Sequence, residues 1–96
     1  MRGLFMVCLP LSLVAKLGVA AEVADSQTAL KLACAAGAEI YEGDKRQLAQ
    51  QDCESKYEAR DGGHEIWVVE PKQHSLGYTS YTVRKSNGDV MVALVQ

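Results

Sequence analysis

The chain has 96 residues, with 10 Lys or Arg against 12 Asp or Glu and a formal charge of −2 at pH 7. It lacks the basic excess of a nucleic-acid-binding domain, so we expect no nucleic-acid partner. The length allows one small domain with a modest core, which leaves little room for a deep catalytic pocket.

Residues 1–21 have the pattern of a secretory signal peptide, with a basic residue near the start, an apolar run over residues 4–15 and small residues at the end. The apolar run is shorter than the roughly 20 residues of a membrane span. We therefore expect cleavage after Ala20 or Ala21 and no stable membrane anchor afterwards; an uncleaved anchor or a buried core helix is the alternative. The mature protein, residues 22–96, is predicted to be periplasmic or secreted.

Processing would also leave an even pair of cysteines. Cys8 departs with the signal peptide, and Cys34 and Cys53 remain in an oxidising compartment. A disulfide between them would stabilise so small a domain by ~3 kcal/mol. Two buried free thiols are the alternative. A redox or metal site has little support, because the pair forms no CxxC motif and has no histidine at ligand spacing. We expect no metal and no cofactor.

A helix is predicted over residues 26–41, with Asp25 or Ser26 as its N-cap and Gly43 just after its end. Apolar side chains recur along it at helical spacing, and most of them are small: Ala29, Leu32, Ala33, Ala36 and Ile40. A helix with so many alanines can lie close to a sheet.

A shorter second helix is predicted over residues 45–51, with Asp44 at its N-cap. It would bring Cys53 back toward Cys34. Residues 53–60 then alternate between charged side chains and small or apolar ones. This period-two pattern is typical of a half-buried strand.

A first hairpin is predicted over residues 53–70. The Asp-Gly-Gly sequence at 61–63 is expected to supply a two-residue loop, and Pro71 to end the returning strand because proline cannot donate a hydrogen bond to a sheet. Whichever pair of those three residues forms the loop, the register places Trp67 and Val69 with the charged side chains. They would then lie on the face turned away from the helix.

A second hairpin is predicted from residues 78–85 and 90–95, around an Asn-Gly sequence that suits a type I′ turn. Its register puts five large side chains on the face toward the helix: Tyr81, Val83, Val90, Val92 and Leu94. Met91 and Val95 fall on the opposite face. The predicted fold class is therefore α+β, an N-terminal helix packed on a four-stranded antiparallel sheet.

Short motifs accompany these elements: Ile40-Tyr41-Glu42-Gly43, Lys56-Tyr57-Glu58-Ala59, Ile66-Trp67-Val68-Val69-Glu70 and Gly77-Tyr78-Thr79-Ser80-Tyr81-Thr82-Val83. Their order resembles that of the small NTF2-fold immunity proteins, in which a curved antiparallel sheet wraps one helix. The resemblance covers nearly all of residues 22–96. It implies a protein that neutralises a cognate toxin by binding it, and it carries over no catalytic residue. A cystatin-like secreted inhibitor has a related helix-on-sheet build.

We therefore expect an exported binding protein and not an enzyme. A protein partner would dock on the outer sheet face around Trp67, Val69, Met91 and Val95, with the charge of Glu58 steering the encounter, because a contiguous apolar patch on a surface usually marks an interface. Homodimerisation through the same face, or a structural role in the periplasm, is the alternative. An NTF2-like enzyme would need a cavity with a buried carboxylate or histidine.

Overall fold

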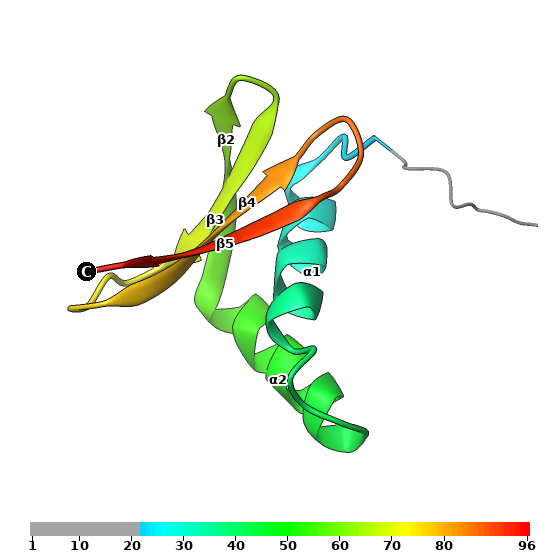
Figure 1. Cartoon of the computed structure of the whole chain (residues 1–96), viewed down its shortest axis with the longest axis vertical. Coiled ribbons are helices and arrows are strands. Elements are labelled where there is room, and N and C mark those ends of the chain that lie inside the picture. Colours follow the sequence, from blue (N-terminus) through cyan, green and yellow to red (C-terminus); the bar gives the residue numbers. More distant parts are fainter. Residues whose placement is uncertain (1–21) are drawn as a thin grey trace, which may run out of the picture.

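Two helices precede a four-stranded sheet in the computed structural model, which describes residues 22–96 (Figure 1). The predicted signal peptide lies outside the described residues. The elements are α1 (Ser26–Gly37), α2 (Asp44–Lys56), β2 (Tyr57–Gly63), β3 (Ile66–Pro71), β4 (Tyr78–Arg84) and β5 (Val90–Val95). The predicted α+β class with four antiparallel strands is confirmed. Within residues 22–96, neither helix has the length and apolar composition of a membrane span.

α1 begins directly after Asp25, whose Oδ1 accepts a hydrogen bond from the N–H of Thr28 (2.8 Å). This cap satisfies one of the free amides of the first turn, and the same hydrogen bond lowers the pKa of Asp25. The helix ends at Gly37 and not at residue 41, because glycine has a low helix propensity. Tyr41 therefore lies in the connection to α2.

α2 is longer than predicted and includes residues 53–56, which we expected in a strand. Gly43 precedes it with φ of 58°, a conformation that glycine adopts without a steric penalty. Asp52 and Lys56, four residues apart, form an ion pair of 3.2 Å on the helix surface. Such pairs stabilise a helix, and the period-two pattern over residues 53–56 was too short to exclude one. None of the α2 residues is buried.

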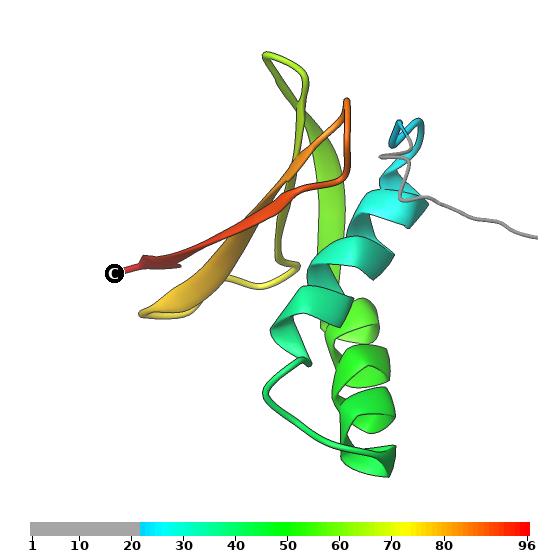
Figure 2. The same ribbon diagram turned by 45° about the vertical axis from the view of Figure 1, so that its right-hand side comes forward.

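The strands follow the chain order β2-β3-β4-β5 across the sheet, so β2 and β5 are its two edges. α1 lies across one face, and α2 packs beside α1 and extends beyond the sheet before it leads into β2 (Figure 2). The core forms between α1 and the two central strands. Its buried residues are Val23, Ala29, Leu30, Ala33, Cys34, Val69, Tyr81 and Val83. The predicted packing of a small-residue helix on a sheet is confirmed.

The turn between β2 and β3 falls at His64 and Glu65 instead of at residues 61–63. Both have positive φ, 48° and 62°, as a type I′ turn requires. Asp61 instead accepts a hydrogen bond from the N–H of Gly63 (2.9 Å), within a β-bulge of β2. The Asp-Gly-Gly sequence therefore forms an irregularity inside the strand and not the turn.

The bulge shifts the register of this hairpin by one residue. Beyond it, Asp61 pairs with Trp67 and Ala59 pairs with Val69. A one-residue shift turns every side chain of a strand to the other face. Our prediction that Trp67 and Val69 face away from the helix is therefore wrong, and both lie on the helix side.

The β4–β5 hairpin has the predicted faces but a longer loop. Val83 pairs with Val90, two residues away from the predicted register. The loop is closed by hydrogen bonds from the N–H of Arg84 to the Asp89 carbonyl (2.9 Å) and from the N–H of Gly88 to the Arg84 carbonyl (2.8 Å). Because the shift is two residues, each side chain keeps its face.

Candidate functional site

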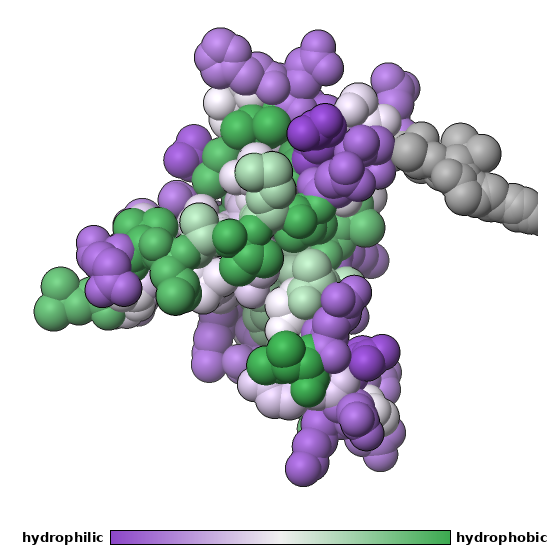
Figure 3. Space-filling model, viewed as in Figure 1, coloured by the Kyte–Doolittle hydropathy of each residue, from purple (hydrophilic) through white to green (hydrophobic). Residues whose placement is uncertain are grey.

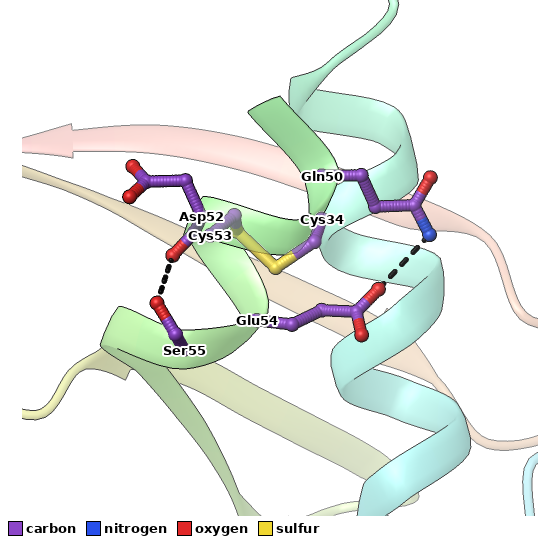
Figure 4. The surroundings of a disulfide bond; sticks show 6 residues. All are labelled: Cys34, Gln50, Asp52, Cys53, Glu54 and Ser55. Atoms are coloured by element: carbon purple, nitrogen blue, oxygen red, sulfur yellow. Dashed lines mark hydrogen bonds between the residues drawn. A yellow bond between two sulfur atoms is a disulfide. The ribbon is translucent and has the colours of Figure 1, made fainter. Parts of the chain in front are cut away.

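A disulfide joins Cys34 of α1 to Cys53 of α2, with the two Cα atoms 5.6 Å apart (Figure 4). The structure thus contains the predicted pair. Cys34 is fully buried in the core, whereas α2 contributes no buried residue. The disulfide therefore attaches a polar, exposed helix to a helix that the core holds in place.

A groove of about 490 Å³ opens beside this disulfide, between the helices and the helix-facing side of the sheet. We call it the disulfide groove. The residues that line it come from both helices, their connection, β2 and β4: Cys34, Gly37, Tyr41, Lys45, Leu48, Ala49, Asp52, Cys53, Lys56, Tyr57 and Tyr81. Gly37 allows a close approach here, because a β carbon at this position would collide with the hydroxyl of Tyr81 unless that side chain moved.

Tyr57 and Tyr81 form an aromatic pair in the disulfide groove. Their ring centroids are 5.8 Å apart and the ring planes are inclined by 59°, which is a favourable aromatic arrangement. Burial raises the pKa of both phenols, and the neighbouring Tyr57 raises the pKa of Tyr81 further. Both hydroxyl groups therefore stay protonated at neutral pH and can donate hydrogen bonds to a bound group.

Exposed apolar side chains line the disulfide groove on its helix side, and others lie on the neighbouring strand β5. On the helix side, Leu48 is 63% exposed and Tyr41 is 43% exposed. On the sheet side, Val92 lies opposite Tyr81 in the register and is 59% exposed, and Leu94 is 74% exposed. They are on the same face of the sheet as α1, but α1 does not bury them. Figure 3 shows apolar side chains gathered along β5 and a second apolar group lower down, over the helices.

Three of the five residues predicted to bind a partner lie on the outer sheet face: Glu58, Met91 and Val95. The other two do not. Val69 is fully buried under α1, and Trp67 packs against the core. Because of the bulge, Ile66 and Val68 lie on the outer face instead, and both are half-buried. The outer face therefore has fewer exposed large apolar side chains than expected.

The Trp67 ring belongs to a cluster that fixes the start of the described chain. Its Nε1–H donates a hydrogen bond to the Val23 carbonyl (2.9 Å), and the Val23 N–H donates to the Lys85 carbonyl (2.7 Å). Lys85 Nζ lies 4.7 Å from a Trp67 ring centroid and 2.9 Å from Asp61 Oδ2. These contacts give Trp67 a structural role.

The Asp61 ion pair predicts a pH dependence. The hydrogen bond from Lys85, assisted by the Gly63 amide, lowers the pKa of Asp61. A carboxyl group whose pKa is lower in the folded state than in the unfolded state stabilises the fold at pH values above its unfolded-state pKa of ~3.9. This contribution is lost as the pH falls through the folded-state pKa. We expect the free energy of unfolding to fall more steeply below pH ~4 in the wild type than in Asp61→Asn.

Urea titrations of both proteins across the acid range measure this difference. The wild type and Asp61→Asn should converge in stability at the acid end, where the carboxyl group of Asp61 is protonated. Parallel stability curves over the whole range would show that the ion pair with Lys85 does not stabilise the folded state.

Sequence reasoning missed the disulfide groove because it extended α1 to residue 41, over the space that the groove occupies. Gly37 was the available signal for an earlier helix end, since it interrupts the run of alanines. No comparable feature of the sequence predicted that Leu48 would be exposed, because its exposure depends on the length and direction of α2.

Within residues 22–96, no group of three or more His, Cys, Asp or Glu side chains is placed to hold a metal ion. The core of these residues contains no buried polar or charged side chain. No protein-family model, curated protein or solved structure matches this chain.

Proposed function

We propose that this is an exported binding protein that receives a protein partner in the disulfide groove, in the manner of an immunity protein that neutralises a cognate toxin. The proposal is carried by exposed apolar side chains: Leu48 and Tyr41 line the groove, and Val92 and Leu94 lie on the same sheet face as the groove-lining Tyr81. Apolar surface concentrated in this way in a small soluble domain is typical of a protein interface.

The composition of the groove supports the same conclusion. Tyr41, Tyr57 and Tyr81 line it, and tyrosine is enriched at the centres of protein interfaces, where it combines apolar area with a hydrogen-bonding group. Lys45, Asp52 and Lys56 also line the groove, so charged groups lie among the apolar ones. Protein interfaces usually combine apolar side chains with polar and charged groups in this way.

The disulfide supports binding by holding one wall of the groove in place. A surface that is rigid before binding loses less conformational entropy when the partner docks. Cys34 and Cys53 both line the groove, so their bond fixes α2 beside the space that the partner would enter. The proposal that the partner is a toxin rests on the sequence motifs and the order of the elements.

A matched pair of leucine variants tests the groove. Leu48 lines it, whereas Leu76 is fully exposed in the connection between β3 and β4 and does not. Because neither side chain is buried, Leu48→Asp and Leu76→Asp should both unfold like the wild type. Leu48→Asp should weaken partner binding by about 2 kcal/mol, whereas Leu76→Asp should change it by less than ~0.5 kcal/mol.

The partner for this measurement is obtained by purifying the tagged chain from the exported fraction of its own organism and identifying the protein that co-purifies. Calorimetric titration of the purified partner then gives the affinities. Equal affinity losses in both leucine variants, or none in either, would contradict docking in the groove.

The immunity role has a separate readout. The partner expressed alone should stop growth, and co-expression of the wild-type chain should restore it, whereas Leu48→Asp should not. A partner that binds in the groove and is harmless to cells would overturn the immunity role and leave the binding site intact.

A further inference from the structure

β5 is an edge strand that lacks the usual protection of an edge. Its six residues, VMVALV, include no charged residue and no proline, and all six pair with β4 in an unbroken register. Within residues 22–96, no further strand pairs with it. Soluble proteins normally protect an edge strand with charges, proline or a bulge, because its free N–H and C=O groups can pair with another chain.

The opposite edge of the same sheet carries these protections. β2 contains Glu58, Arg60 and Asp61, and the β-bulge at its end disrupts regular pairing. Glu58 and Arg60 are both exposed. One edge of the sheet is therefore closed to a further strand and the other is open.

The hydrogen bonds to β4 determine which backbone groups of β5 are free. The N–H of Arg84 donates to the Asp89 carbonyl (2.9 Å), and the hydrogen-bonded residues alternate along an antiparallel pair. Residues 91, 93 and 95 therefore direct their backbone groups toward β4. Val90, Val92 and Leu94 direct theirs toward the open edge, with the side chains of the last two 59% and 74% exposed.

We propose that β5 pairs antiparallel with β5 of a second copy, so that two four-stranded sheets join into one around a two-fold axis. With Val92 opposite its own counterpart, Val90 faces Leu94 and Met91 faces Ala93. The residues paired through backbone hydrogen bonds are then those whose N–H and C=O groups are free. Each face of the junction is apolar and places no like charges together.

The second copy is favoured over an unrelated strand by the charges of β5. Recognition of a foreign strand takes its specificity from side-chain pockets or from complementary charges beside the edge, and Val90–Val95 carries no charge. A two-fold pairing needs no such recognition, because the same apolar surface is self-complementary. This inference does not rest on the proposed function. Val92 and Leu94 have side chains near the disulfide groove as well, but the pairing uses the free backbone groups of β5 and not the groove-lining residues of the helices.

Sedimentation equilibrium of the full-length chain, purified after the cell's own processing, tests the dimer. One strand pair buries less area than a standard interface of ~800 Å² per partner, so we expect a dissociation constant on the order of 10 µM. The average mass should rise from that of the monomer to that of the dimer as the protein concentration increases through this value. A monomer throughout the range up to roughly 1 mM would overturn the proposal.

Val92→Pro tests the backbone pairing. Proline removes one free N–H at the open edge and leaves the hydrogen bonds to β4 intact, and edge strands tolerate it. We expect the dissociation constant to rise at least about tenfold, while thermal unfolding of the dilute monomer changes little. Leu76→Pro, in the connection outside the strands, is the control for a general effect of proline on an exposed position.

A pair of charge variants tests the register without proline. Val92→Lys and Val92→Glu each place like charges opposite one another across the two-fold axis and should each be monomeric. An equimolar mixture of the two should form a mixed dimer, because the charges then attract. If dimers persist in every Val92 variant, or are lost only in Leu48→Asp, pairing through β5 is wrong.

The two proposals fail separately. A monomeric wild type that still binds its partner overturns the strand pairing alone. A wild-type dimer for which Leu48→Asp has no effect on partner binding overturns the groove alone.

Discussion

Replacing Cys34 and Cys53 together by alanine should lower the free energy of unfolding by ~3 kcal/mol. The two cysteines are 19 residues apart in the sequence, and without the bond between them the unfolded chain gains conformational entropy. The loss should be large relative to a total that is only ~5–15 kcal/mol in small proteins. Urea denaturation of the double variant and of the wild type, with and without reductant, measures it.

Hydrogen exchange distinguishes loss of attachment from general destabilisation. Because α2 has no buried residue of its own, its amides should lose protection in the double variant while those of β3 and β4 retain most of theirs. A stability loss below ~1 kcal/mol with α2 still protected would show that packing against α1 suffices to hold the second helix.

Trp67→Ala should lower the free energy of unfolding by about 3 kcal/mol, since truncating a large core side chain leaves a cavity. The indole packs against the core, donates a hydrogen bond to the Val23 carbonyl and lies beneath Lys85 Nζ. Trp67→Phe retains most of the apolar contact and removes the hydrogen bond, so it should cost about 1 kcal/mol.

Circular dichroism is the appropriate measurement for these variants, because Trp67 is the single tryptophan of the chain and its fluorescence is lost with it. Val68→Ala is the control in the neighbouring position of β3, on the outer face. It should cost less than Trp67→Ala. If Trp67→Ala instead unfolds like the wild type, the side chain does not contribute to the core.

Local patterns in the sequence were sufficient to predict much of the fold. The capping carboxylate of Asp25 marked the start of α1, and the alanines on its inner face indicated close packing on a sheet. The Asn-Gly sequence marked the second hairpin, and the faces of Tyr81 and Val83 followed although the loop was longer than predicted. These features depend on residues close together in the chain.

The register of the first hairpin could not be decided in this way. Residues 66–69 are Ile, Trp, Val and Val, so β3 is apolar on both faces, and a binary pattern does not choose between them. Asp-Gly-Gly is also a stronger turn signal than the His-Glu pair that forms the turn. The packing of α1 over Val69 favours the observed register, and that contact is remote in sequence.

The disulfide groove was not predictable for a related reason. Its position depends on where α1 ends and how far α2 continues, and helix ends are the least certain part of a sequence-based prediction. The cysteine pair was found by counting, but counting does not give the space beside the bond. Leu48 and Tyr41 line the groove because α2 packs beside α1.

The order of the strands has a consequence for the folding of the chain. Every strand pairs with its neighbour in sequence, so the sheet has a low contact order and can form one hairpin at a time without closing long loops. The link from Val23 to Lys85 is different, because it joins the start of the described chain to the end of β4. Closure of that long loop should be a late step in folding, and β5 is the last described strand to be synthesised.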